Sequence, residues 1–331
     1  TFEVKVVSIV VACGFDPYTP HDGEFGYKIS DDVITLPQFK RLVDICDKEL
    51  VWKNKPVKTV SFIYCVGSRQ VDGDNKYCSR YCCTTTIYSA IKAGEKFKGL
   101  DFFHFTRGIR TYGKEELLYY QASKDGQIFL QSYEDEPPSV EVKNGKTTVR
   151  INDILSLKKE VEVESDLVVL VIGMVPRAES TIGEILKTPR GRDNFFNEIH
   201  MKLRPVETVI DGITISGCCQ GPKNVVESIN SAQSAAIKAY SFVSSETLLV
   251  EPIVATVNPE LCSWCDACAE SCPFDAIQQQ EIGDKRVAEI NPTVCKGCGM
   301  CLPVCPTNAI QLKTYGDEEV TRMISVLANE L

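Results

Sequence analysis

The residues best suited to chemistry in this chain are its 16 cysteines, a large number for 331 residues. Some lie in the stretch IYCVGSRQVDGDNKYCSRYCC at 63–83, and others lie in two short runs at 262–273 and 295–306. Cysteines of short secreted chains form disulfides, whereas clustered thiols of a longer chain in a reducing compartment are more often metal ligands. The clustering therefore favours thiolate-bound metal sites over disulfides.

The two C-terminal runs read CSWCDACAESCP and CKGCGMCLPVCP, and both follow the C-x2-C-x2-C-x3-C-P pattern of bacterial ferredoxins. Three cysteines of each run bind one [4Fe–4S] cluster, and the fourth binds the other cluster. Zinc sites usually pair two C-x2-C knuckles, so zinc fits this repeat poorly. The spacing predicts two electron-transfer clusters, one held by Cys262, Cys265, Cys268 and Cys305 and the second held by Cys295, Cys298, Cys301 and Cys272.

Composition and charge exclude several other classes of protein. Hydrophobic residues make up 44% of the chain and charged residues 24%, which is ordinary for a globular protein with cores for two or three domains. The formal net charge of −9 argues against a nucleic-acid partner, which needs a clustered basic surface. The sequence contains neither an apolar run of about 18 residues, as a membrane span requires, nor a signal-peptide pattern. We therefore expect a cytoplasmic protein.

The elements that must position these thiols alternate between β-rich and helical segments, which predicts an α/β architecture. β-rich runs at 4–12, 166–172 and 211–217 each end near a glycine, and a helix rich in Ser and Ala is expected after the last of them. The elements expected between the first two runs are strands at 58–64, 100–105 and 127–132, helices at 84–98 and 114–126, and β segments at 139–142 and 147–151.

In this order the segments VACGFDP (11–17), VIGMVP (171–176) and ITISGCC (213–219) resemble flavoprotein disulfide reductases of the thioredoxin-reductase type. The resemblance implies a pair of Rossmann-type dinucleotide-binding domains, incomplete at the N-terminus because the G-x-G-x-x-G strand is missing. That half must come from another polypeptide or from a longer chain. The implied domains are a partial FAD-binding domain at 1–55 and 200–248, an inserted NAD(P)-type domain at 56–180, a di-cluster ferredoxin domain at 252–315 and a C-terminal helix at 316–331.

The same resemblance implies where FAD would bind. Cys13 and Cys218 replace the Thr and Asp of that family, and thiols are weak hydrogen-bond partners, so the flavin would rely more on backbone groups. A helix start near Glu227 and Ser228 would present N–H groups and a positive dipole. The implied FAD contacts are Ala12, Cys13, Gly14, Gly217, Cys218, Val226, Glu227 and Ser228.

The stretch at 63–83 departs from a nucleotide-binding domain where the phosphate loop should begin. Cys65 follows the expected strand in place of a glycine fingerprint, which argues against NAD(P)H binding there. Cys65, Cys78, Cys82 and Cys83 are too clustered, with too few apolar neighbours, to be interpreted as buried small hydrophobes. Thiolate-rich sites suit iron–sulfur clusters or zinc, and the spacing alone leaves both open.

The pattern C-x12-C-x3-C-C, followed by a di-cluster ferredoxin, resembles the C-terminal portion of the A-type subunit of heterodisulfide reductase over essentially the whole chain. CVGSRQ, YCSRYCC, RGIRTYGK, VIGMVPRAE and GCCQGPKNVVESINSAQSAA carry the match. The resemblance implies that Cys65, Cys78, Cys82 and Cys83 bind a third [4Fe–4S] cluster beside the FAD.

The resemblance also implies a function. The chain would be an iron–sulfur flavoprotein subunit that passes electrons between FAD and ferredoxin-type clusters in flavin-based electron bifurcation, with reduction of CoB–CoM heterodisulfide and ferredoxin in methanogenesis. The implied partners are the chain that carries the N-terminal FAD half, heterodisulfide reductase B and C type subunits, a hydrogenase or formate dehydrogenase module, and ferredoxin. The alternatives are a non-bifurcating electron-transfer subunit of a quinone-interacting sulfur-metabolism complex or an aromatic acyl-CoA reductase, and a wiring module without flavin.

A few candidate residues receive no role from the sequence. Lys92 lies further from the Cys-Cys pair than the lysine that the family places near its flavin, so no catalytic side chain is assigned. Arg107, Arg110 and Lys114 are interpreted as solvated charges, with a place near the flavin or another charged group as the alternative. Cys46 and Cys219 are left unassigned.

Overall fold

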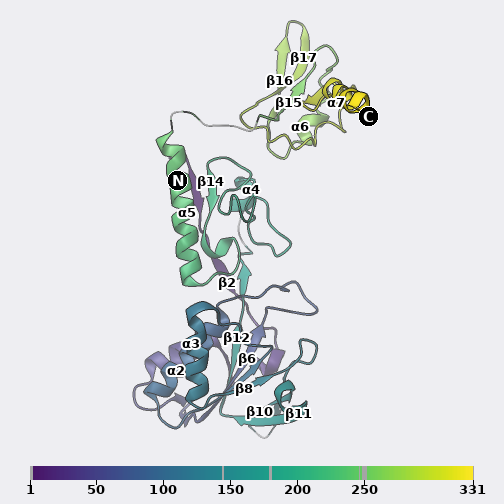
Figure 1. Ribbon diagram of the computed structural model, residues 1–331. Coiled ribbons are helices and arrows are strands. Elements are labelled where there is room, and N and C mark those ends of the chain that lie inside the picture. Colours follow the sequence, from purple (N-terminus) through teal and green to yellow (C-terminus); the bar gives the residue numbers. More distant parts are fainter. Residues whose placement is uncertain (1–2, 144, 179–180, 246, 248–251, 331) are drawn as a thin grey trace.

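The computed structural model describes residues 3–330 except 144, 179–180, 246 and 248–251. The structure has three parts: an α/β unit around a five-stranded sheet, a unit beside one long helix, and a small β-rich unit at the C-terminal end (Figure 1). The second part is formed by segments that come before and after the first part in the sequence. No helix in the described part of the chain is long and apolar enough to cross a membrane.

The first part is built on a parallel sheet with the strand order β3-β12-β6-β7-β8, which confirms the α/β fold class. Its central strands are almost continuously apolar, because a parallel sheet is covered on both faces. The elements are β3 (Val33–Thr35), α1 (Leu36–Ile45), β4 (Val51–Trp52), β5 (Lys55–Pro56), β6 (Thr59–Val66), α2 (Cys82–Lys96), β7 (Asp101–Thr106), α3 (Glu116–Lys124), β8 (Ile128–Gln131) and β12 (Leu167–Ile172).

Two layers cover the faces of this sheet. On one face, α1 and α2 pack Phe39 and Ala90 into a core with Phe62 of β6. On the other face, a three-stranded antiparallel sheet packs Val149 and Val163 into a core with Ile63 of the same strand. The antiparallel sheet has the order β11-β10-β9, with bounds β9 (Ser139–Lys143), β10 (Lys146–Asp153) and β11 (Lys159–Ser165).

Some elements of this part differ from the sequence expectations. The expected elements do not include β11, although its sequence KEVEVES alternates glutamates with Val161 and Val163 as a half-buried strand does. β3 and α1 fall within 1–55, which the sequence assigns to the partial FAD domain, yet β3 pairs with β12 in the sheet of the inserted domain. A three-residue strand carries no periodic signal, so only its pairing partner decides which sheet it joins.

The second part contains β1 and β14, which pair in parallel, and the long helix α5, which lies beside them (Figure 1). The expected strand at 4–12 is shortened to three residues, and Val4 and Val7 before it are exposed. Along α5, Ala235 is buried whereas Ile237 and Tyr240 are exposed. The elements are β1 (Ile9–Val11), β2 (Phe15–Pro17), β13 (Met174–Pro176), α4 (Ile182–Ile185), β14 (Ile213–Ile215) and α5 (Val225–Ser244), and β2 pairs antiparallel with β13.

The third part consists of two short antiparallel pairs, β15 with β18 and β16 with β17. The β16–β17 hairpin occupies the segment between the two cysteine runs, as the ferredoxin pattern predicts. Its small core includes Cys262, Cys268 and Cys301 beside Val287 and Ile310. The elements are β15 (Ala255–Val257), α6 (Ala267–Glu270), β16 (Ile277–Ile282), β17 (Lys285–Ile290), β18 (Ile310–Leu312) and α7 (Asp317–Glu330).

Candidate metal and cofactor sites

Cys65 is turned towards helix α2 by an irregularity in strand β6. Along β6, Tyr64 faces the helices and Ile63 faces the opposite side, so strict alternation would point Cys65 away from the helices. Cys65 instead has a left-handed φ of 61°, and the pairing of β6 with β12 shifts its register at this point. This β-bulge brings Cys65 into the same buried cluster as Cys82 and Cys83.

The loop that carries Cys78 is anchored on both sides of that residue. The Tyr77 hydroxyl donates to the Met174 carbonyl oxygen at 3.0 Å, and the Met174 N–H donates to Ser79 Oγ at 2.9 Å. Gly173 lies against this anchor, and a Cβ there would come within 2.7 Å of Ser79 Oγ. The loop therefore closes onto the end of β12 because residue 173 lacks a side chain.

The four thiols of Cys65, Cys78, Cys82 and Cys83 lie within electrostatic range of one another. Burial raises the pKa of Cys65 to about 11, and the charge of Cys83 adds to this effect. A hydrogen bond from Cys82 lowers the pKa of Cys83 to about 7, and the same bond raises the pKa of Cys82. Four thiolates are the usual ligands of a [4Fe–4S] cluster, so these four cysteines supply the donor types that such a cluster needs. Across the described residues, no group of three or more His, Cys, Asp or Glu side chains is arranged to hold a metal ion.

Positive groups lie against this thiol set. Arg69 Nη1 is 4.0 Å from Cys65 Sγ, and the Arg69 side chain is 10% exposed. Arg110 lowers the pKa of Cys83 through a backbone hydrogen bond and through its charge, after the larger effect of the Cys82 hydrogen bond. Thiolate ligands carry negative charge, so these groups favour the form of the thiols that binds metal.

The structure separates the arginines and lysine that the sequence grouped together. Lys114 is exposed, as interpreted, whereas Arg110 is exposed and also an electrostatic neighbour of Cys83. Arg107 is partly buried and donates from Nη1 to the Arg69 carbonyl oxygen at 2.6 Å, so its interpretation as a solvated charge is wrong. Sequence reasoning missed Arg69, although its position in CVGSRQ, four residues after Cys65, was an available signal.

Helix α5 is tied to the cysteine loop by Glu227. Asn224 caps the helix: its Oδ1 accepts from the Glu227 N–H at 2.8 Å, and its own N–H donates to Glu227 Oε2 at 3.0 Å. Glu227 also forms an ion pair with Arg80 of the cysteine loop and accepts from the Tyr112 hydroxyl at 3.1 Å. The carboxylate of Glu227 therefore joins two parts of the chain.

This cap changes the expected flavin contacts of the helix start. The N–H groups of Glu227 and Ser228, which the sequence places against the flavin, both donate to Asn224. The cap and the first helical turn already use these N–H groups, and the contacts of Glu227 and Ser228 with FAD stay a prediction. Val226, by contrast, is exposed at the first turn, and its contact with FAD stays a prediction.

The other predicted FAD contacts lie at the carboxyl ends of β1 and β14. Because these strands are parallel neighbours, Gly14 and Gly217 follow them at the same edge. Both glycines have positive φ, 77° and 68°, and a Cβ at either would meet nothing within 4 Å. The space beside both turns is open, and ligands of α/β folds bind beyond the carboxyl ends of strands. This edge therefore fits a bound cofactor.

Cys218 and Cys219, at the carboxyl end of β14, form hydrogen bonds with other groups of the chain. Cys218 Sγ donates to the Lys223 carbonyl oxygen at 3.5 Å and lies 3.7 Å from Ser228 Oγ. Cys219, which the sequence left unassigned, is buried and donates to the carbonyl oxygens of Val11 and Ser216. Cys219 therefore joins β1 to β14, and the flavin would rely on the backbone at this edge, as the sequence predicts.

The second cysteine run groups with Cys272 of the first run. Burial raises the pKa of Cys301 to about 11, and the charges of Cys295, Cys298 and Cys272 add to this effect. The same four cysteines line one cavity together with Ile277. This grouping supports the predicted exchange of the fourth ligand between the two runs.

Backbone N–H groups point at four of the ferredoxin thiols. Such N–H···S bonds help to set the potential of an iron–sulfur cluster. The donors and acceptors are Ala255 to Cys295 at 3.4 Å, Ala276 to Cys272 at 3.4 Å, Ala288 to Cys262 at 3.3 Å and Ala309 to Cys305 at 3.2 Å.

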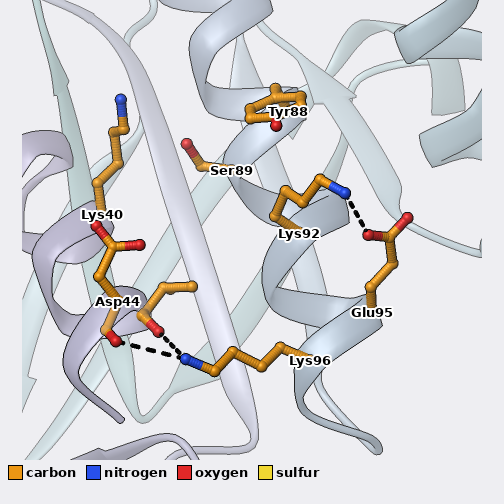
Figure 2. A pocket seen from close by; sticks show the side chains of 8 residues that line it. Lys40, Asp44, Tyr88, Ser89, Lys92, Glu95 and Lys96 are labelled. Carbon is orange, nitrogen blue, oxygen red and sulfur yellow. Dashed lines mark hydrogen bonds and ion pairs between the residues drawn. The ribbon is translucent and has the colours of Figure 1, made fainter. Parts of the chain in front are cut away.

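Lys92 lies in a groove between α1 and α2, away from the thiols (Figure 2). Its Nζ donates to Glu95 Oε2 at 2.7 Å, and Lys96 donates to the Val43 carbonyl oxygen at 2.8 Å. Lys92 comes nine residues after Cys83 on the same helix, a separation of about 14 Å along the axis at the usual rise. The groove therefore offers no reason to give Lys92 a role at the thiol site.

The chain is similar to known iron–sulfur proteins. A family profile for a 4Fe-4S dicluster domain matches residues 252–320 and confirms the two-cluster ferredoxin domain. The chain is 38% identical over 296 residues to the second A-type iron-sulfur subunit of the CoB–CoM heterodisulfide reductase of Methanopyrus kandleri, covering 86% of this chain and 44% of that protein. This chain is a homologue of the A-type heterodisulfide reductase subunits. The resemblance drawn from the cysteine pattern is therefore confirmed.

Other heterodisulfide reductase proteins of the A type match in the same way. The A-type subunit of the H2:CoB–CoM heterodisulfide, ferredoxin reductase of Methanothermobacter marburgensis is 34% identical over 289 residues, with 84% of this chain and 43% of that protein covered. The chain thus spans less than half the length of these relatives. Among solved structures, a thioredoxin reductase of T. acidophilum is similar with a TM-score of 0.47 and 10% identity, covering 72% of this chain and 66% of that one.

Proposed function

We propose that this chain is part of an oxidoreductase subunit that passes electrons between FAD and three [4Fe–4S] clusters in a heterodisulfide-reductase-type complex. The observation that carries the proposal is the meeting of Cys65, Cys78, Cys82 and Cys83 at the end of β6, where a nucleotide-binding domain would hold its phosphates. Homology with subunits named for heterodisulfide and ferredoxin reduction supports the substrate class.

The position of Tyr81 supports electron exchange between the flavin edge and the third cluster. When bound, FAD exchanges electron pairs and iron–sulfur clusters exchange single electrons. Burial raises the pKa of Tyr81, and the charges of Cys82 and Cys218 both add to this effect. Cys82 belongs to the thiol set and Cys218 to the flavin edge, so both sites lie within electrostatic range of one side chain.

The ferredoxin domain also contacts the part of the chain that carries the flavin edge. Lys296, within the second cysteine run, forms an ion pair with Asp211 just before β14. A second ion pair joins Lys187 to Asp275. Both pairs join the ferredoxin domain to the second part of the chain, and Asp211 lies at the amino end of β14, opposite the flavin edge.

We further propose that the whole complex performs flavin-based electron bifurcation. A hydrogenase or formate dehydrogenase module would supply an electron pair to the FAD. One electron would reduce the CoB–CoM heterodisulfide at B and C type subunits, and the other would reduce ferredoxin. The G-x-G-x-x-G half of the FAD domain would come from a separate chain or from a longer form of this one.

The proposal is tested on the complete complex under anaerobic conditions. Ferredoxin reduction by hydrogen or formate is measured with and without heterodisulfide, and flavin absorbance is recorded on the same sample. We expect ferredoxin reduction to require heterodisulfide. Ferredoxin reduction without heterodisulfide would contradict bifurcation and leave simple electron transfer, and a complex without flavin absorbance would leave only the wiring module.

A matched pair of variants connects the activity to the thiol set. Cys65→Ala should abolish electron transfer to ferredoxin while the ferredoxin-domain clusters keep their paramagnetic resonance signals. Cys46→Ala is the control, because the Cys46 thiol donates only to the Val51 carbonyl oxygen, at 3.7 Å, in another part of the sheet domain. Full activity in Cys65→Ala would contradict the proposed route.

A further inference from the structure

Arg69 is held in the loop after Cys65 by backbone hydrogen bonds. Its N–H donates to the Tyr77 carbonyl oxygen at 2.8 Å, and its own carbonyl oxygen accepts from Arg107 Nη1 at 2.6 Å. Arg69 Nη1 donates in turn to the Arg107 carbonyl oxygen at 2.9 Å. Each arginine therefore binds the backbone of the other, and the Arg69 guanidinium has one preferred position.

That position lies against the thiol set and is shielded from water. Nη1 of Arg69 is 4.0 Å from Cys65 Sγ, and the arginine side chain is 10% exposed. The other end of the guanidinium forms an ion pair with Glu134, whose side chain is 57% exposed. The positive charge thus acts from a site of low dielectric, whereas the charge of its partner is screened by solvent.

We propose that Arg69 raises the reduction potential of the third cluster by stabilising its reduced state. The inference rests on the third cluster of the proposed function. A [4Fe–4S] cluster with four thiolate ligands is an anion and gains one more negative charge on reduction. A fixed positive charge beside it therefore stabilises the reduced form more than the oxidised form. Arg69 acts through the cluster and is a positioning residue, not a catalytic one.

A purely structural role for Arg69 predicts a different result. The hydrogen bonds between Arg69 and Arg107 also hold the loop after Cys65. Replacing Arg69 therefore changes both the charge beside the cluster and the hydrogen bonds that fix the loop. Glu134 separates these effects, because its replacement leaves the bonds between the arginines and increases the net positive charge beside the cluster. An electrostatic role predicts potential shifts of opposite sign for Arg69→Gln and Glu134→Gln. A structural role predicts shifts of the same sign or none.

The experiment uses the full chain, purified anaerobically with its clusters, as wild type and as Arg69→Gln, Arg69→Lys, Glu134→Gln and Arg150→Gln. Arg150 is the matched control, because it also pairs with a carboxylate, Glu141 at 2.8 Å, but lies in the antiparallel sheet. Iron per chain is measured first. The midpoint potential of the third cluster is then measured by redox titration followed by paramagnetic resonance.

We expect about twelve irons per chain in every variant, four for each cubane. The potential should fall in Arg69→Gln by the equivalent of a tenfold change in the reduction equilibrium, about 59 mV for one electron. The potential should fall less in Arg69→Lys, because lysine keeps the positive charge but lacks the planar guanidinium with its several N–H donors. It should rise in Glu134→Gln and stay unchanged in Arg150→Gln.

The outcomes separate this inference from the proposed function. An unchanged potential in Arg69→Gln with full iron overturns the inference and leaves the third cluster in place. Shifts of the same sign in Arg69→Gln and Glu134→Gln also overturn it. If Arg69→Gln loses the cluster, Glu134→Gln decides: a rise in potential supports the inference, and no change overturns it. About eight irons in the wild type would remove the third cluster and overturn both proposals.

Discussion

The ferredoxin domain and the sheet domain gather their thiols by different routes. In the ferredoxin domain, Cys295, Cys298 and Cys301 follow one another in a single loop, so local spacing sets the arrangement. In the sheet domain, Cys65 comes from a strand and Cys82 from the start of a helix, and a left-handed bulge turns the first towards the second. The first arrangement is a property of a short segment, whereas the second exists only after the sheet has formed.

The two domains also differ in what fills their cores. Three of the ferredoxin cysteines are buried beside small residues such as Ala255 and Ala288. The sheet domain instead buries large side chains, among them Phe39, Phe62 and Leu167. A small domain with few buried apolar residues depends on its metal for stability, whereas a large apolar core does not. Cluster loss should therefore unfold the first domain and leave the second folded.

The largest effect is expected for Cys301→Ala, which removes a predicted cluster ligand that is also a core residue. The ferredoxin domain should lose at least one cluster and become sensitive to proteolysis, because metal binding and folding are coupled there. Iron should fall from about twelve to about eight per chain or fewer. Cys46→Ala serves as a control for handling losses. Full iron content and unchanged protease resistance in Cys301→Ala would show that the ferredoxin domain does not depend on its clusters for folding.

A smaller structural effect is expected for Cys83→Ala. This change should remove the proposed third cluster, with a loss of about four irons, while the sheet domain keeps its circular dichroism and its cooperative unfolding. The helix α2 that carries Cys83 is held by other buried residues, including Ile87 and Ala90. Loss of the sheet itself in this variant would show that both domains depend on their clusters.

The pH dependence of stability should distinguish the sheet domain. His104 is fully buried, its Nδ1 lies 2.9 Å from the Tyr64 hydroxyl and its Nε2 lies 2.9 Å from Gln127 Oε1. Burial lowers its pKa to about 4. Since the unfolded imidazole binds protons near pH 6.5, stability is fully present above that pH and is lost as the pH falls towards 4.

We expect the free energy of unfolding of the sheet domain to drop by about 1 kcal/mol between pH 7 and pH 5.5 from this group. Urea denaturation followed by circular dichroism at several pH values measures the drop. His104→Asn should remove most of this slope because no titrating group remains at the site. An equal slope in the variant and the wild type would assign the acid sensitivity to other groups.

The smallest effect is expected at the start of α5, which lies between the two thiol-rich domains in the sequence. Asn224→Ala removes the capping bond to the Glu227 N–H and should lower the free energy of unfolding by about 1 kcal/mol. Asn230→Ala, in the same helix but past its first turn, is the matched control and should change stability by less than about 0.5 kcal/mol. Equal effects of the two changes, measured by urea denaturation, would contradict the capping role.

Local signals explain which elements could be predicted. β6, β7, β8 and β12 are marked by apolar runs, and the cap of α5 has the Asn-x-x-Glu signature of a capping box, a signal that sequence reasoning missed. β11 also had an alternating pattern that was overlooked. β3 had no comparable signal, because three residues are too few for a period and its pairing with β12 joins positions far apart in the chain.

The candidate site divides in the same way. Cysteine spacing alone indicated the two ferredoxin ligand sets, and the four clustered cysteines at 65–83 indicated a metal site without its geometry. The positions of Arg69, Arg107 and Glu227 depend on contacts between separate loops and helices. The sequence does not distinguish an arginine that faces solvent from one that faces a thiol, because the packing around the side chain decides its position.

The sequence by itself indicated the class of the fold, the likeness to A-type heterodisulfide reductase subunits and the predicted ligands of the ferredoxin clusters, since each of these follows from residues close together in the chain. Only the tertiary structure decided that Cys65 faces Cys82 and Cys83, that Arg69 lies buried beside Cys65, and that Glu227 is held by a cap and an ion pair. The physical reason is the left-handed backbone at Cys65 and the closure of loops onto a finished sheet, which no local spacing encodes.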